Sequence, residues 1–466
     1  MAFYTPTVFN YYGGDSARYM RLDFVGVSGI FGDNAMPAGY PAFLALLRGI
    51  SEWLPLTTMV QHLLGLGAAA LLYAAVVRVG APKWAALLPL AVMAFSGDQI
   101  FLEHGIFTEA LWMPVLALGM YLLARSIATA SPRWWLVAGG AVLACSALVR
   151  HVSLALPLVL ALWAAAALPG RPRVRLAHAA AIVVSAMLVI GAYFVVSKPI
   201  AGGYSGLAEN QGFSLYGRVG QFADCSKFTP PTGTSPLCVE TPPDQRPGPF
   251  FWTFGEQSPI RTTFQLDSYN DDHQQFLARF GRAAILNQPW DYAHTVLHDF
   301  ARYFAPDIGT PRPDSGSDAE SMSFGSTVPT AQGASLEQLA DQFDEAYSGV
   351  GSGQADETAR TLLGGYQSVF RVQGALTLIL IGLAFTGALV GHGRMRAGAS
   401  LFLATGLALL ALPPLLSSYD VRYSVPPINL LSAGAAFGLA VIAQRIAARH
   451  APHNAIEPNV ETLVRR

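Results

Sequence analysis

Residues 57–77 read TTMVQHLLGLGAAALLYAAVV, an apolar run that contains no Asp, Glu, Lys or Arg. A helix that crosses a bilayer needs about 20 such residues. Further apolar runs follow at residues 85–96, 107–124, 134–149, 152–168, 176–197, 372–390, 399–416 and 425–443, of which 85–96 is short for a span. The pattern predicts an all-α polytopic membrane protein.

The composition of the chain supports the same class. Of its 466 residues 52% are hydrophobic and 13% are charged, against roughly 45–50% and about 25% in soluble domains. The mean hydropathy is +0.37. So little charge cannot cover the surface of a soluble globule of this length, and so much apolar content excludes disorder. The net charge of −1 gives no indication of a nucleic-acid partner.

The distribution of Lys and Arg predicts the topology, because cytoplasmic loops are enriched in these residues. One set of alternate loops is basic: Arg78, Lys83, Arg125, Arg133, Arg171, Arg173, Arg175, Arg394, Arg396, Arg445 and Arg449. The opposite set is mixed: Asp98, Glu103, Glu109, Arg150, Asp420 and Arg422. This alternation favours two crossings rather than one long helix within residues 134–168. It places the N-terminal segment and the loop 198–371 outside and the tail in the cytoplasm.

The predicted organisation follows from these crossings. Residues 1–56 form an outer N-terminal loop with a juxtamembrane helix, and residues 57–197 the first part of the bundle. Residues 198–371 form an outer loop domain, residues 372–443 the second part of the bundle, and residues 444–466 the cytoplasmic tail. No span precedes the outer N-terminal segment. Either a first span lies upstream of this sequence, or the following helix drives translocation of the short segment.

The outer loop changes composition toward Pro, Gly, Asp, Gln and Ser, and residues 309–333 are typical of a flexible linker. Residues 276–304 show helical apolar spacing that is broken at Pro289. Two interpretations stay open: short amphipathic helices on the outer membrane surface, or helices of a soluble cap domain.

Cysteine usage predicts one disulfide. Cys225 and Cys238 lie in a turn-rich part of the outer loop, where an oxidising compartment allows them to pair. Cys145 falls within a predicted span, as a small apolar side chain. Two cysteines alone are too few for a structural zinc site.

The outer N-terminal segment contains Gly13, Gly14 and Asp15, followed by Arg18 and Tyr19 at helical spacing. Asp15 is a candidate carboxylate at the mouth of a cavity. The alternative is that Asp15 caps a short surface helix and that Arg18 is solvated.

The next outer loop carries Asp98, Glu103 and His104, and Glu109 opens a hydrophobic helix. A carboxylate at the edge of a span must be wet, paired or metal-bound. The alternative for Glu109 is a charge that favours the helix N-terminus.

Arg150 and Arg422 lie at the same predicted membrane edge. The planar guanidinium donors match phosphate oxygens. For each arginine the alternative is an interfacial anchor or a salt bridge to an outer carboxylate. Charged groups that collect at one interface, instead of at the midplane where transporters hold them, favour an enzyme that acts on a lipid headgroup.

These motifs resemble those of the GT-C superfamily of membrane glycosyltransferases that use polyprenyl-phosphate sugars. The most similar branch contains protein O-mannosyltransferases and lipid A aminoarabinose transferases. The matching stretches are Gly14-Asp15-Ser16-Ala17-Arg18-Tyr19, Pro37-Ala38-Gly39-Tyr40-Pro41, Thr108-Glu109, Leu148-Val149-Arg150, and Arg422-Tyr423 before Pro426. Met36 stands where the aminoarabinose branch has a Lys, which argues against lipid A as the acceptor.

The resemblance implies a helical bundle with outer juxtamembrane helices, and glycosyl transfer with inversion at the outer face. Asp15 would be the general base and Glu109 a second acid of the site. The implied phosphate or substrate contacts are Arg18, Tyr19, His104, Arg150 and Arg422. In some members of the family the second acid helps to bind a divalent metal as cofactor, and the candidate ligands here are Glu109, Glu103 and Asp33.

The expected partners are a polyprenyl-phosphate-linked sugar, the bilayer, and a glycan, lipid or protein acceptor. The expected location is the inner membrane of a bacterium, with the site facing outside. Three alternatives remain: a polymerase or ligase of lipid-linked glycans, a transporter or flippase, and an inactive scaffold of the same fold. The sequence contains no Walker loop, HExxH or dinucleotide motif.

Overall fold

The computed structural model describes residues 16, 19–20, 30–31, 36–129, 132–200, 207, 211–265, 271–305, 322–324, 347–348, 357–371 and 374–450. Within them the regular structure is helical, apart from one isolated bridge between Trp53 and Ser348. The α-helices are α3 (Gly39–Ile50), α4 (Leu54–Val79), α5 (Lys83–Phe95), α6 (Gly97–His104), α7 (Glu109–Ile127), α8 (Arg133–Ala147), α9 (Leu156–Ala167), α10 (Pro172–Ile200), α11 (Gln211–Gly220), α12 (Pro249–Phe254), α13 (Pro259–Thr262), α14 (Asp271–Asn287), α15 (Pro289–Arg302), α17 (Glu357–Val369), α18 (Gly374–Val390), α19 (Gly393–Leu416) and α20 (Val425–His450). Short 3₁₀ turns include η2 (His151–Ala155) and η5 (Val421–Ser424). The prediction of an all-α polytopic membrane protein is confirmed.

The spans differ in length. Five helices of the described residues are long and apolar enough to cross a membrane: α4, α7, α10, α19 and the continuous run of η5 and α20. Two bent pairs raise the number to seven, since α5 continues into α6 after a 50° bend and α17 meets α18 at 43°. The helices α8 and α9 are shorter, with 15 and 12 residues. The bend after α5 explains why the predicted span at residues 85–96 is short.

The helices α8 and α9 are separate and run in opposite directions. Arg150, between them, pairs with Glu109 at the start of α7. Trp163, near the end of α9, donates from its indole nitrogen to the carbonyl of Ala397, near the start of α19, at 3.1 Å. The chain therefore turns back at Arg150, as expected from the distribution of Lys and Arg.

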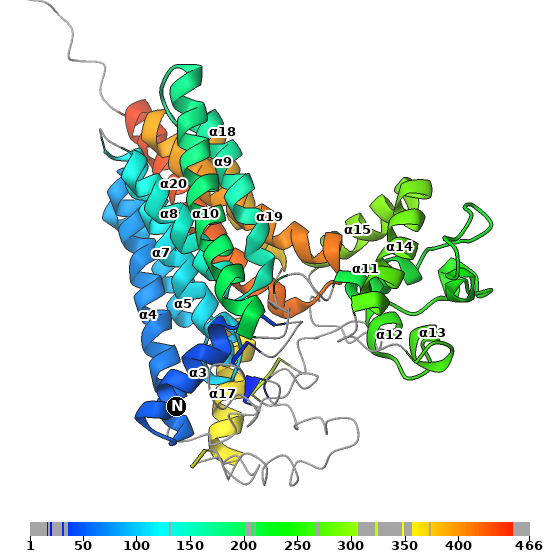
Figure 1. Ribbon diagram of the computed structural model, residues 1–466. Helices are drawn as coiled ribbons and strands as arrows, with labels where there is room; N and C mark the ends of the chain where they lie inside the picture. The colour runs from blue at the N-terminus through cyan, green and yellow to red at the C-terminus, as the bar shows by residue number, and fades with distance from the viewer. Residues whose placement is uncertain are drawn as a thin grey trace, which may run out of the picture.

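The two sets of charged loops lie at opposite ends of the bundle (Figure 1). The end at which α7, α9 and α20 begin carries the acidic and mixed set, including Glu109, Arg150 and Arg422. The basic loops lie where α4, α7, α9 and α18 end. This separation agrees with the sequence, and which end faces the outside stays a prediction, as do the predicted domain limits.

Proline and glycine explain where several helices begin and end. α4 starts with Pro55 in its first turn and stops at Gly80, whose φ of 117° lies in the left-handed region that favours glycine. Small residues let α20 approach α18, because a side chain at Gly438 would meet the carbonyl of Leu383. Close backbone contact of this kind is a common source of packing between membrane helices.

The helices α11 to α15 form a separate unit beside the bundle, drawn in green in Figure 1. We call it the outer unit because it lies within the loop that the sequence predicts to be outside. Its core consists of buried apolar side chains from these helices and their loops: Phe213, Tyr216, Val219, Phe228, Leu237, Trp252, Ile260, Leu277, Phe280 and Ala284. Leu277, Phe280 and Ala284 belong to α14, so the apolar face of this helix packs inside the unit. The predicted linker at residues 309–333 lies outside the described residues except for residues 322–324.

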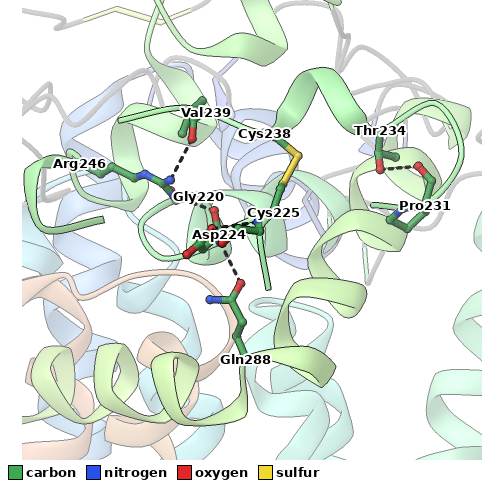
Figure 2. Close-up of a disulfide and its surroundings, with 11 residues drawn as sticks. Gly220, Asp224, Cys225, Pro231, Thr234, Cys238, Val239, Arg246 and Gln288 are labelled. Carbon is green, nitrogen blue, oxygen red and sulfur yellow. Dashed lines mark hydrogen bonds between the residues drawn. A yellow bond between two sulfur atoms is a disulfide. The ribbon is translucent and has the colours of Figure 1, made fainter. Parts of the chain in front are cut away.

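Cys225 and Cys238 form the predicted disulfide, with a Cα–Cα distance of 5.9 Å (Figure 2). Arg246 also connects the two ends of this loop, because it donates to the carbonyls of Ala223 at 2.8 Å and Val239 at 3.1 Å. The loop is therefore held by one covalent bond and by a guanidinium group that spans it.

A buried ion pair joins the outer unit to the bundle. Arg218 of α11 is fully buried and donates to Asp299 of α15 at 2.7 Å and to the carbonyl of Ser417, just after α19, at 2.8 Å. We expect Arg218→Met to destabilise the fold by about 3–5 kcal/mol, because it leaves the Asp299 carboxylate buried without its partner. Chemical denaturation of the detergent-solubilised protein measures this change.

Lys227 provides the matched control. It pairs with Asp291 at 2.9 Å, and both side chains are about half exposed. We expect Lys227→Met to change stability by less than about 1 kcal/mol. Equal losses in the two variants would contradict a structural role for the buried pair.

Candidate functional site

Glu109 lies between two arginines that come from distant parts of the chain. Its Oε1 atom is 2.5 Å from Arg150 Nη1 and 3.0 Å from Arg422 Nε. Thr108 donates to its Oε2 atom at 3.1 Å. The Glu109 side chain is 3% exposed, and those of Arg150 and Arg422 are 14% and 8% exposed. Sequence analysis predicted all three residues, and the structure brings them together.

The salt-bridge alternative is therefore observed for both arginines, but for Arg150 it does not use all the guanidinium donors. Arg150 contacts Glu109 and Thr108 through Nη1 alone. Among the described residues, its Nε and Nη2 atoms donate to no protein acceptor. A guanidinium has five N–H donors in a fixed plane, so Arg150 can hold Glu109 and bind an anion at the same time.

Aromatic rings surround the two guanidinium groups. The Tyr423 ring lies 4.8 Å from the Arg150 guanidinium carbon and 5.5 Å from that of Arg422. Trp112 lies 5.6 Å from Arg150, and Phe107 lies 5.5 Å from Arg422. Rings at such distances favour a cation over their faces and restrict the orientations available to both arginines.

The Pro37 to Pro41 motif packs directly behind this site. The amide of Gly39 donates to the carbonyl of Leu148 at 2.8 Å, and a side chain at Gly39 would overlap that carbonyl. The glycine therefore allows α3 to contact the turn that carries Arg150. Tyr40, the next residue, donates to Gln61 of α4 at 2.7 Å. Burial, together with the nearby charge of Glu109, raises the pKa of Tyr40 well above its usual value.

The N-terminal segment reaches the same loop. Ser16 donates to the carbonyl of Ile106 at 2.9 Å, three residues before Glu109. The Tyr19 ring meets the Tyr40 ring edge to face at 5.2 Å. Asp15, Arg18 and Asp33 lie outside the described residues, so their predicted roles stay predictions.

A second cluster of polar side chains lies next to the loop between α6 and α7, and it contains His104. His62 of α4 contacts Glu103 Oε2 through Nδ1 at 3.1 Å and His104 Nδ1 through Nε2 at 3.3 Å. Glu103 Oε1 accepts from Gln99 at 2.8 Å, and Gln99 accepts from Asn429 of α20 at 2.8 Å. His104 therefore belongs to a cluster with Glu103, whereas Arg150 and Arg422 share Glu109.

Sequence analysis missed His62, although a signal was present. His62 lies inside the predicted span 57–77, and the sequence argument that charged groups collect at one interface did not consider it. Polar side chains in a span usually have a partner. A side chain at Gly65 would overlap the Glu103 carboxylate, so Gly65 leaves the space in which Glu103 reaches α4.

Asp98 forms a third contact, between α6 and the last residues of the outer loop. Its Oδ1 atom accepts from Gln367 of α17 at 2.8 Å and from Arg371 at 3.0 Å. The amide of Gly97 donates to the carbonyl of Phe370 at 3.1 Å. The bends of the two broken helices are thus bonded to each other.

The described residues do not fit the predicted divalent metal. They contain no group of three or more His, Cys, Asp or Glu side chains placed to hold an ion. Glu109 Oε1 faces two cations, and the Glu103 oxygens accept from His62 and Gln99. The metal stays a prediction from the resemblance.

Comparison with known proteins gives a structural likeness but no sequence match. No protein-family model matches the chain. No curated protein matches it either. The chain is similar to the crystal structure of ArnT from Cupriavidus metallidurans bound to undecaprenyl phosphate, with 13% sequence identity and a TM-score of 0.34. The match covers 94% of this chain and 74% of that one.

Proposed function

We propose that this protein is a membrane glycosyltransferase that moves a sugar from a polyprenyl-phosphate carrier to an acceptor. In this proposal the site faces the outside of a bacterial inner membrane, and Asp15 is the general base. The observation that carries the proposal is Arg150: it is partly exposed, it is held by Glu109 and Thr108, and its Nε and Nη2 donors have no acceptor among the described residues.

The chemistry of the carrier explains why such an arginine is useful. When the bond between the sugar C1 atom and the phosphate oxygen breaks, the electron pair stays on the phosphate, whose negative charge increases. Two parallel N–H groups of a guanidinium match two phosphate oxygens, and donors placed before the reaction stabilise the charge that develops. The leaving phosphate is already anionic and needs no acid.

The acceptor end of the reaction needs one base. As the acceptor oxygen bonds to C1 from the opposite face, its proton passes to the carboxylate of Asp15, and the sugar inverts. A positioned base contributes about 10²- to 10⁴-fold to such a step. Ser16 next to Ile106 supports a role for the N-terminal segment at this loop.

The lipid part of the donor fits the position of the site at the end of the bundle. Glu109 opens α7 and Arg422 lies in η5, directly before α20. A phosphate bound here would leave its chain free to extend along the spans. The bundle carries many large apolar side chains on its exposed surface, including Leu63 and Leu188 at 66% and 69% exposure.

The full-length protein in nanodiscs, incubated with labelled polyprenyl-phosphate sugars, tests the proposal. We expect release or transfer of the sugar, and Arg150→Met should lower kcat/KM by about 10- to 100-fold, the value of a hydrogen bond to a charged group. Arg125→Met is the matched control, because Arg125 stacks on Trp135 at 3.7 Å at the opposite end of the bundle. It should react like wild type.

Two results would contradict the proposal. One is that wild type turns over no polyprenyl-phosphate sugar. The other is that Arg150→Met and Arg125→Met have the same activity. If the protein instead moves a lipid-linked or small solute across liposomes without consuming a donor, the transporter class replaces the enzyme.

A further inference from the structure

The helices α14 and α15 of the outer unit expose several large apolar side chains. On α15, Trp290 is 85% exposed and Leu297 is 63% exposed, and at the end of α14 Leu286 is 79% exposed. Trp290 and Leu297 are seven residues apart and therefore share one helix face. We call Arg279, Arg282, Leu286, Trp290 and Leu297 the α14–α15 edge.

This edge is attached at the end of a membrane span. Tyr292, in the first turn of α15, donates to the carbonyl of Leu415 in the last turn of α19 at 2.9 Å. In Figure 1, α14 and α15 lie on the side of the outer unit that is turned toward the end of the bundle with the basic loops. The helices α12 and α13 lie on the opposite side of the unit. The edge therefore lies beside the spans, near the level where α19 ends.

The residue types on the edge suit the boundary between lipid and water. Trp is enriched at membrane interfaces, where its ring is apolar and its N–H finds water or headgroups. Arg279 and Arg282 are exposed and lie on the same face of α14 as Leu286. Basic residues next to Trp and Leu are typical of helices that lie on anionic lipid.

The carboxylate that follows Trp290 in the sequence, Asp291, does not oppose this attraction. Hydrogen bonds from Gln288 and Lys227 lower the pKa of Asp291, so the group stays ionised but is paired with the Lys227 ammonium at 2.9 Å. The other acidic residue of the α15 turns, Asp299, is paired with Arg218 inside the fold.

The corner between α14 and α15 is held rigidly. Gln288 accepts from the amide of Asp224 at 2.9 Å and donates to Asp291 at 2.8 Å. Asp224 precedes Cys225 of the disulfide, and Figure 2 shows Gln288 below this loop. The edge is thus presented by a fixed corner, which reduces the conformational entropy lost when a surface binds.

We propose that the α14–α15 edge docks on the anionic headgroup layer of the membrane that the bundle spans. The opposite face of α14 packs in the core of the outer unit. The two interpretations left open by the sequence then apply to different faces of one helix: one face belongs to a folded domain, and the other lies on lipid. Docking fixes the outer unit over the membrane next to the end of α19.

Spin labels on the full-length protein in nanodiscs of phosphatidylcholine and phosphatidylglycerol test this placement. The free thiol is removed by Cys145→Ala, and the disulfide is kept by omitting reductant. Labels are attached to Leu286→Cys, to Trp290→Cys and, as a control, to Glu256→Cys in the exposed turn between α12 and α13. We expect the ratio of oxygen to nickel-chelate collision rates to be several-fold higher at 286 and 290 than at 256.

Two outcomes would overturn the proposal. Ratios at 286 and 290 equal to that at 256 would show an edge in water. Low collision rates with both reagents would show an edge covered by protein, for example by a second copy of the chain. Replacing Trp290 could itself abolish membrane contact. The label at Leu286→Cys leaves Trp290 in place, so a high collision ratio at 286 with a low ratio at 290 identifies this effect.

Discussion

Replacing Asp15 by Asn is expected to lower sugar transfer by about 10²- to 10⁴-fold, the usual contribution of a general base. Asn has the same size as Asp but cannot take the acceptor proton. The neighbouring Ser16 is bonded to Ile106, so the segment reaches the loop that ends in Glu109. The measurement is the turnover of labelled polyprenyl-phosphate sugar by the full-length protein.

Comparing kcat with the affinity for polyprenyl phosphate distinguishes a general base from a residue that only supports the structure. Asp15→Asn should reduce kcat and leave the affinity for polyprenyl phosphate close to that of wild type, because the phosphate is assigned to Arg150. Ser16→Ala is the matched control. It removes one hydrogen bond to a carbonyl, worth about 0.5–1.5 kcal/mol, and should cost about 10-fold or less. Wild-type turnover by Asp15→Asn would exclude Asp15 as the base.

The sequence predicted which groups share one end of the bundle. Arg150 and Arg422 are far apart in the chain, yet counting spans between them assigns both to the end where Glu109 opens α7. This works because apolar length determines where a helix crosses and each crossing changes the side of the membrane. Apolar length alone did not decide between one helix and two within residues 134–168, and the distribution of Lys and Arg placed the turn at Arg150 between α8 and α9.

The sequence did not predict which side chains contact each other within that end. His62 and Glu103 meet because α4 presents one face to α6 and because Gly65 leaves room for the carboxylate. The rotation of a buried helix is determined by packing with several neighbours, and the apolar residues of α4 are distributed around the whole helix. The bend between α5 and α6 was also not predicted, although Ser96 is a signal for it, because its hydroxyl accepts from the amide of Gln99 and caps α6.

The disulfide and the α14 face illustrate the same limit in the outer unit. Cys225 and Cys238 were predicted to pair because they were the two cysteines of one turn-rich loop. Helical spacing predicted apolar faces within residues 276–304 but not what covers them. Only the structure shows that Leu277 and Phe280 are buried while Leu286 is exposed.

Replacing Glu109 by Gln is expected to have the largest effect on the fold of any single change at the site. Glu109 is 3% exposed and neutralises part of the charge of Arg150 and Arg422. Without the carboxylate, two guanidinium groups repel each other in a place with little water. Removing one partner of a buried ion pair costs about 3–5 kcal/mol, and we expect a loss of this size in denaturation of the solubilised protein.

A double variant distinguishes the loss of the ion pairs from a general disturbance of α7. Glu109→Gln combined with Arg422→Gln removes one of the two positive charges that repel each other. The double variant should therefore regain part of the stability lost by Glu109→Gln alone. Losses that simply add would mean that Glu109 and Arg422 do not act on each other. Sugar transfer should stay low in both variants, because Arg150 then lacks the carboxylate that holds its Nη1 atom and directs its other donors away from the protein.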